Sequence, residues 1–243
     1  MAAGAQKKLT AFTDGGCTQN GKPGARAAYS AIIYEDSGAI LTIGDLVAGS
    51  EYKLECSVPK SSVPECSVPE CSKPECSALE CSKPECSTPE YRLSTGPGAV
   101  PVSNNRGELL GIIHGLRAMI GYGRSHPGAA EYELVTDSRI CAMTLLSWLP
   151  TRRAAGTVNK LKNLDLIMIA ERLLSDLRAL GPTTITTVHS HVRVPPAEAR
   201  ARFLWQGNNA ADEVTSRVLA AGAASTASAA GVASAVSAAN STA

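Results

Sequence analysis

A repeat of seven pentads over residues 55–89 limits what this chain can fold into more than any other feature. The pentads follow the template E-C-S-x-P without a gap; the second has lost its Glu and Cys, and the fifth its Pro. Proline in nearly every pentad favours extended chain, and pentads without bulky apolar residues cannot bury a core. We therefore predict that residues 51–95 are a disordered or extended low-complexity insertion, since lengthening a surface loop costs little closure entropy.

Six of the eight cysteines lie in the pentads, spaced mostly at five, whereas zinc modules pair their ligands as C-x₂₋₄-C. Soft-metal binding or oxidation of these thiols stays open, as does a cysteine-rich metal or redox module attached to a passive domain. Cys17 and Cys141 stand apart, unlike a secreted disulfide scaffold. With no apolar leader and no run of about 18 apolar residues, we expect an intracellular protein (cytoplasm or nucleus), neither secreted nor in a membrane.

Charge is nearly balanced, with 23 basic and 22 acidic residues, but it is unevenly distributed. Residues 55–90 hold seven acidic and three basic residues, so the rest of the chain is mildly basic. That balance suits nucleic acid as a partner, although many enzymes share it. Residues 221–243 carry no charge and are almost entirely small, so we expect a disordered Ala/Ser-rich tail.

Hydrophobic periodicity outside the repeat predicts five strands and four helices. The strands are expected over residues 8–14, 25–34, 39–47, 132–136 and 183–188, and the helices over 103–120, 138–148, 161–180 and 208–219. Three strands followed by helix, strand, helices, strand and helix indicate an α/β domain with a mixed five-stranded sheet flanked by helices.

Four carboxylates stand out, although each has an ordinary structural explanation. Asp14 reads as an Asp-Gly turn residue, Glu108 as a capping-box acid, Asp137 as a helix N-cap and Asp212 as a first-turn acid. Asp14 and Asp137 also follow core strands, where open α/β sheets place their sites. Several ionised carboxylates in one site require a compensating cation such as Mg²⁺, and four of them outline a two-metal phosphoryl-transfer site.

The sequence around these acids is more specific than the acids alone. In chain order it contains TDGGC at 13–17, NNRGEL at 104–109, LVTDS at 134–138, KNLDL at 162–166 and NNAADE at 208–213. These motifs resemble the type 1 ribonuclease H family over residues 7–50 and 91–220. The resemblance implies a ribonuclease H-like fold whose first three strands are antiparallel. It also implies a single catalytic domain over 7–220, interrupted by the insertion.

The resemblance further implies an activity, namely endonucleolytic hydrolysis of the RNA strand of RNA–DNA hybrids, leaving 5′-phosphate and 3′-hydroxyl ends. Two Mg²⁺ ions, with Mn²⁺ as a substitute, would be bridged by Asp14. Asp212 would help hold the ion that activates water. Glu108 and Asp137 would hold the ion at the leaving group. His191 matches a mobile-loop histidine that aids proton movement or product release, although the stretch from His191 to Asp212 is longer than in typical members.

Substrate contacts are implied in the same way, with helix capping and solvated loop charge as the alternatives. We expect them at Cys17, Asn104, Asn105, Arg106, Arg152, Arg153, Lys162 and Asn163. The expected partner is an RNA–DNA hybrid, bound by a monomer without a small-molecule cofactor. A catalytically weak or inactive hybrid-binding protein on the same fold is the alternative function.

Overall fold

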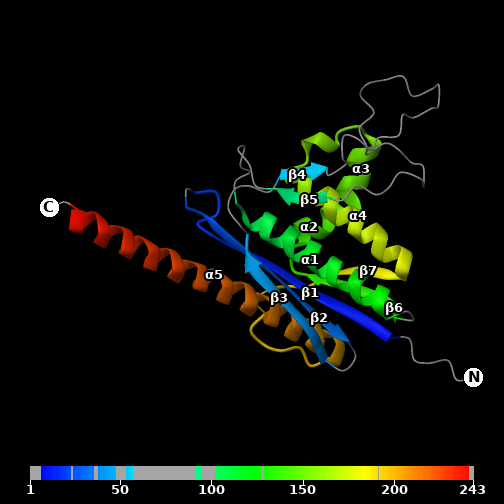
Figure 1. Cartoon of the computed structure of the whole chain (residues 1–243). Helices are drawn as coiled ribbons and strands as arrows, with labels where there is room; N and C mark the ends of the chain where they lie inside the picture. The colour runs from blue at the N-terminus through cyan, green and yellow to red at the C-terminus, as the bar shows by residue number, and fades with distance from the viewer. Residues whose placement is uncertain are drawn as a thin grey trace, which may run out of the picture. The chain divides into compact units, whose positions relative to one another are not determined.

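A computed structural model describes residues 7–22, 24–35, 38–47, 53–56, 91–94, 102–126, 129–190 and 192–240 (Figure 1). The chain divides into two compact units, one formed by residues 1–50 with 100–243 and the other by residues 51–99. Within the smaller unit, β4 (Lys53–Cys56) pairs antiparallel with β5 (Tyr91–Ser94). Residues 57–90, which hold most of the pentads, lie outside the described ranges, so the disordered insertion stays a prediction.

The larger unit is built on a five-stranded sheet. Its strands are β1 (Lys7–Thr18), β2 (Arg26–Glu35), β3 (Gly38–Leu46), β6 (Ala129–Thr136) and β7 (Thr183–Thr187), in the order β3-β2-β1-β6-β7. The first three pair antiparallel, whereas β6 pairs parallel with both β1 and β7. The expected mixed sheet is therefore confirmed, and the strand order is that of the ribonuclease H-like fold.

Helices cover both faces of this sheet. They are α1 (Asn104–Ser125), α2 (Arg139–Met143), a π-helical turn (Thr144–Trp148), α3 (Leu149–Ala154), a short 3₁₀ turn (Val158–Lys160), α4 (Leu164–Leu180) and α5 (Ala199–Asn240). Successive residues of β1 point to opposite faces. Ala11 and Thr13 face Gly115 of α1, whereas Phe12 faces Gly207 of α5. The helices α1 and α4 thus lie on one side of the central strand and α5 on the other (Figure 1).

An aromatic cluster fixes α5 to the sheet. Phe12 is fully buried and meets Tyr34 and Phe203 edge-on, with ring centroids 5.4 and 5.3 Å away. Such edge-to-face pairs add to the stability from area burial. Gly207 lies directly over the Phe12 ring, where any Cβ would overlap it. The helix that carries Asp212 is therefore held close to the strand that carries Asp14.

The last helix begins earlier and ends later than expected. Pro195 and Pro196 precede the helix, and the Glu198 carboxylate accepts hydrogen bonds from the backbone N–H groups of Arg200 and Ala201. These bonds satisfy donors that a helix start leaves free, so the helix begins at Ala199 rather than near Asn208. At the other end α5 continues past residue 221 to Asn240, and the disorder expected of the Ala/Ser-rich tail stays a prediction. Alanine, the strongest helix former, is the commonest residue there.

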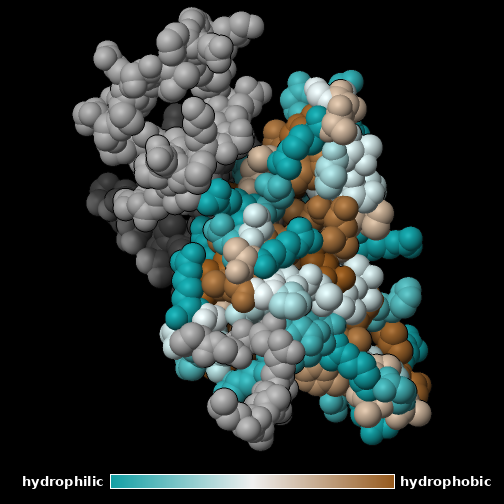
Figure 2. All heavy atoms as spheres, turned by 90° about the vertical axis from the view of Figure 1, so that its right-hand side faces the viewer, coloured by the Kyte–Doolittle hydropathy of each residue, from teal (hydrophilic) through white to brown (hydrophobic). Residues whose placement is uncertain are grey.

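The surface mixes hydrophilic and hydrophobic side chains. On the face shown in Figure 2, hydrophobic residues form patches between hydrophilic ones. Among the described residues, Ile140, Trp148 and Val194 are large hydrophobics left exposed. No helix within the described ranges is both long and apolar enough to cross a membrane.

The contact between α1 and the sheet depends on glycine. Gly107, Gly111 and Gly115 recur every four residues, so they share one face of α1. A Cβ on Gly111 would lie 2.8 Å from the Asp14 carbonyl oxygen and 2.9 Å from that of Ser30. A Cβ on Gly15 of β1 would overlap the backbone nitrogen of Glu108. The helix therefore packs backbone against backbone on β1 and β2.

We expect Gly111→Ala to destabilise the protein by about 1–3 kcal/mol, because α1 would have to move off the sheet. Gly121→Ala is the matched control on the same helix, since a Cβ there meets nothing within 4 Å. The control should stabilise by up to about 1 kcal/mol through helix propensity alone. Urea unfolding of both variants checks this, and equal effects would contradict the close approach.

Candidate functional site

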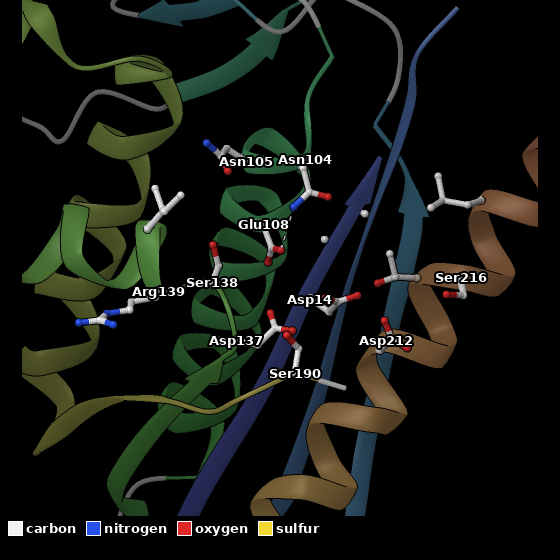
Figure 3. A pocket seen from close by; sticks show the side chains of 15 residues that line it. Asp14, Asn104, Asn105, Glu108, Asp137, Ser138, Arg139, Ser190, Asp212 and Ser216 are labelled. Atoms are coloured by element: carbon white, nitrogen blue, oxygen red, sulfur yellow. Dashed lines mark hydrogen bonds between the residues drawn. The ribbon is translucent and has the colours of Figure 1, made fainter. Parts of the chain in front are cut away.

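A cavity of about 390 Å³ opens where β1 and β6 lose their pairing (Figure 3). The parallel ladder between these strands ends at the pair Thr13 and Thr136. Asp14 is the next residue of β1 and Asp137 directly follows the end of β6, so the two acids emerge side by side. The remaining polar side chains that line the cavity are Asn104, Asn105, Glu108, Ser138, Arg139, Ser190, Asp212, Thr215 and Ser216.

Three carboxylates meet in this cavity. Asp14, Glu108 and Asp137 each offer an oxygen atom, and these atoms lie within 4.8 Å of one another. Asp14 and Glu108 are both buried. Asn104 Nδ2 donates to Glu108 Oε1 at 3.3 Å. Among the described residues, Glu108 Oε2 is the buried side-chain atom that has no hydrogen-bond partner.

An orphaned buried carboxylate oxygen indicates a missing positive partner, because leaving such an atom unpaired costs considerable free energy. A hard divalent cation takes carboxylate oxygens as its ligands, and Asp14, Glu108 and Asp137 supply them. The donor set and the orphaned atom therefore fit a Mg²⁺-like ion.

The pKa values report the same crowding. Burial raises the pKa of Asp14 from 3.8 to about 6, and the charges of Asp137 and Asp212 add to the rise. A hydrogen bond from the Thr215 hydroxyl opposes it. Burial also raises the pKa of Glu108 well above its usual value, helped by the Asp14 and Asp137 charges. Without a cation, the ionised cluster is thus unfavourable.

Asp212 reaches the cavity from the opposite side, on α5 (Figure 3). It is not one of the three acids whose oxygen atoms lie within 4.8 Å of one another. Its charge nonetheless raises the pKa of Asp14, so the two carboxylates interact. The structure therefore brings all four predicted acids to one cavity, three of them in close proximity.

The ordinary explanations for these acids do not hold. Asp14 lies inside β1 and pairs in register with Ser30, so it is not a turn residue. The helix α1 begins at Asn104 with Ser103 as N-cap, which puts Glu108 beyond the capping positions. Ser138, not Asp137, is the N-cap of α2. Asp212 lies well inside α5, away from the dipole of the first turn.

The predicted site histidine, His191, lies outside the described residues, and its role stays a prediction. The neighbouring Ser190 lines the cavity. After it, the connection to α5 is fastened to that helix, because Trp205 Nε1 donates to the Val192 carbonyl at 2.7 Å. Arg202 likewise donates to the carbonyls of Pro196 and Ala197, both at 3.0 Å. The long stretch between His191 and Asp212 is therefore largely the start of α5, preceded by a short connection that is partly anchored to that helix.

Arg106, a predicted substrate contact, is buried and makes contacts within the protein, and its role toward a substrate stays a prediction. Its side chain is only 2% exposed, and its guanidinium makes two bonds to Asp165, at 2.7 and 3.1 Å. It also donates to Asn163 Oδ1 at 3.4 Å. Asn163, another predicted contact, is the left-handed N-cap residue that starts α4. The Arg106–Asp165 ion pair joins the starts of α1 and α4 and keeps the Arg106 side chain buried.

The other predicted contacts separate into groups. Asn104 and Asn105 line the acidic cavity. Arg152, Lys162 and Asn163 line a second cavity of about 230 Å³, together with Trp148 and Lys160. Asn105 and Ile140 line both cavities, so the two adjoin. Arg153 pairs with Glu171 at 3.0 Å, and Cys17 is half-buried and lines neither cavity.

Three features of the site were missed from the sequence. Thr215 lies one helical turn after Asp212, a spacing that could have indicated a shared face. The four-residue spacing of Gly107, Gly111 and Gly115 could have indicated the close helix contact. The second cavity depends on how α3 and the 3₁₀ turn fold, which the predicted contacts at Arg152, Arg153 and Lys162 alone do not indicate.

Comparison with known proteins gives structural matches alone. No family model matches the chain, and no curated protein does. Solved structures do match. The crystal structure of RNase H1 from the archaeon Halobacterium salinarum NRC-1 is similar to this chain at 16% sequence identity and a TM-score of 0.44, and the match covers 87% of this chain and 97% of that one. The solution structure of the PFV RNase H domain matches at 13% sequence identity and a TM-score of 0.49, covering 88% of this chain and 94% of that one. A foamy viral protease-reverse transcriptase in complex with RNA/DNA hybrid matches at 12% sequence identity and a TM-score of 0.48, covering 88% of this chain and 20% of that one. The fold assignment rests on strand order and register rather than on these matches.

We expect the cation-free protein to lose stability as pH rises from about 4 to 6. The pKa of Asp14 is raised from 3.8 to about 6, so the folded state binds a proton more tightly than the unfolded state across that window. The loss for Asp14 amounts to up to about 3 kcal/mol. Urea unfolding in EDTA at pH 4 and pH 7 measures it.

Asp14→Asn should flatten this pH dependence and raise stability at pH 7. Asp176→Asn on α4, which removes a surface partner of Arg172, is the control and should keep the wild-type slope. If the stability of Asp14→Asn changed with pH as steeply as that of the wild type, the raised pKa of Asp14 would not be the cause of the pH dependence.

Proposed function

We propose that this protein is a divalent-cation-dependent ribonuclease H that hydrolyses the RNA strand of RNA–DNA hybrids endonucleolytically, leaving 5′-phosphate and 3′-hydroxyl ends. The observation that carries the proposal is the buried cluster of Asp14, Glu108 and Asp137 with an unpartnered Glu108 oxygen. The cluster lies within the TDGGC, NNRGEL and LVTDS motifs that resemble the family.

The four acids would hold two Mg²⁺ ions, or Mn²⁺ in their place. Asp14 is central, because its pKa responds to both Asp137 on one side and Asp212 on the other. Glu108 and Asp137 complete one half of the cluster, and Asp212 approaches the other from α5 (Figure 3). When bound, such cations activate water and stabilise the charge on the departing oxygen.

The chain's own residues position and orient the substrate. Asn104 already donates to Glu108, so it holds that carboxylate in place while its neighbour Asn105 lies at the junction of the two cavities. Amide groups at this junction can donate to or accept from 2′-hydroxyls, which distinguish RNA from DNA. The buried Arg106–Asp165 pair fixes the helix start that carries both asparagines.

The second cavity offers a place for the nucleic-acid backbone. Arg152, Lys160 and Lys162 supply positive charge beside the partly exposed Trp148. Such charges contact phosphates and position a duplex without reading its sequence. Because this cavity adjoins the acidic one at Asn105, a bound strand can reach the carboxylates while its backbone meets the basic side chains.

We expect Asp14→Asn to lower hybrid cleavage at least about 100-fold, because it removes the carboxylate shared by both halves of the cluster. The assay is cleavage of an end-labelled RNA–DNA hybrid in Mg²⁺ and in EDTA, beside RNA duplex, DNA duplex and single-stranded RNA. Asp176→Asn serves as the matched control and should cut like the wild type.

Cutting of the hybrid's RNA strand alone, dependent on the cation, is the result expected of the wild type. Hybrid binding without cutting in Mg²⁺ or Mn²⁺ would favour the inactive binder instead. Undiminished cleavage by Asp14→Asn would show that this carboxylate is not a shared ligand.

Replacing Arg152 and Lys162 together by Gln should weaken hybrid binding and reduce the slope of log affinity against log salt by about 2, one unit for each lost phosphate contact. Fluorescence anisotropy in EDTA measures the slope without cleavage. The control is Arg172→Gln with Arg178→Gln on α4, which removes equal charge from residues that line neither cavity. An equal loss of slope in both double variants would contradict a specific basic surface.

A further inference from the structure

A pair of buried hydroxyl groups lies behind Asp14. Ser30 on β2 is the register partner of Asp14 on β1, and Thr215 comes from α5 on the face that Asp14 points to. Thr215 Oγ1 donates to Ser30 Oγ at 3.0 Å, and Ser30 Oγ donates to the Ala211 carbonyl at 2.9 Å. Thr215 and Asp14 line the same cavity, and a hydrogen bond from the Thr215 side chain lowers the pKa of Asp14. Ser30 is fully buried and Thr215 is 2% exposed, so water does not compete for these bonds.

Ser30 prevents the usual local bond of a helical threonine. A threonine hydroxyl in a helix commonly bonds the carbonyl four residues earlier, which for Thr215 is that of Ala211. Here the Ser30 hydroxyl occupies that carbonyl. The Thr215 hydroxyl is therefore left to point away from its own helix, toward β1 and β2.

The hydroxyl protons allow two arrangements. Thr215 has one proton, and both Ser30 Oγ and the Asp14 carboxylate can accept it. The Ser30 hydroxyl donates its own proton to the Ala211 carbonyl, so Ser30 keeps that hydrogen bond when Thr215 turns away. A bond to an ionised carboxylate is about twice as strong as one between neutral groups. Thr215 can therefore donate to Asp14 in place of Ser30 at little cost.

We infer that Thr215, held outward by Ser30, is a positioning residue that orients the Asp14 carboxylate toward the cation site. The inference rests on the proposed cation site, to which it adds a supporting shell from α5 and β2. By bonding one side of the carboxylate, Thr215 would leave the other Asp14 lone pairs available to a cation shared with Glu108 and Asp137. Groups that orient metal ligands in this way typically change metal affinity 10–100-fold.

The test is Mn²⁺ binding to the full-length protein, measured by calorimetry without substrate, beside hybrid cleavage. Thr215→Val keeps the branched shape that packs against Gly16 but removes the hydroxyl. We expect it to weaken Mn²⁺ binding about 10–100-fold and to lower cleavage. Thr215→Ser restores the hydroxyl and should bind within a few-fold of the wild type.

Two further variants separate positioning from packing. Ser30→Ala frees the Ala211 carbonyl, so an intact Thr215 should turn back to its own helix and Mn²⁺ affinity should fall. Thr13→Val is the control, because Thr13 is equally buried but bonds the Val135 carbonyl on the opposite face, at 3.3 Å. It should lose stability without losing Mn²⁺ affinity.

Wild-type affinity in both Thr215→Val and Ser30→Ala would overturn the inference, as would an equal loss in Thr13→Val. Failure of the proposed function looks different: the wild type would bind Mn²⁺ yet leave the hybrid intact, and the affinities would still decide the role of Thr215. A wild type that binds no Mn²⁺ would overturn both.

Discussion

The backbone contact between β1 and α1 is the constraint on which the site depends. Glu108 can reach Asp14 because Gly15 has no side chain and because Gly107 and Gly111 face the strands. With any larger residue at these positions, the helix would stand off the sheet by roughly the thickness of a methyl group. The carboxylates would then separate and become solvated, and their combined affinity for a cation would fall. Packing and electrostatics are thus coupled at one short stretch of strand.

The same contact makes the cation-free site unfavourable. Burial of Asp14 and Glu108 beside Asp137 raises the pKa values of both buried acids, and one Glu108 oxygen remains without a partner. The aromatic cluster around Phe12 and the Arg106–Asp165 pair hold the surrounding elements in place despite this repulsion. Stability elsewhere in the domain therefore keeps together a set of charges that would otherwise move apart, as functional sites commonly require.

Much of this could be predicted from the sequence, for identifiable reasons. The five strands follow from alternation and β-branched runs, and the antiparallel pairing of the first three from the resemblance that the motifs carry. The four acids follow from their positions after strands and in those motifs. Roles that depend on three-dimensional neighbours could not be predicted: Arg106 reads as a free cation until Asp165 is placed beside it, and Thr215 reads as an ordinary helix residue. The start of α5 depends on a carboxylate cap at Glu198, which local propensity alone does not reveal.

The strand pair β4–β5 has a consequence for how the repeat can change over time. Cys56 and Tyr91 are directly opposite each other in that ladder, so the two ends of the pentad tract leave from neighbouring points. Adding or deleting a whole pentad alters the contour length between these points but not their separation, and the entropy of closure varies only with the logarithm of length. The number of pentads can therefore change while the register of the paired strands stays the same.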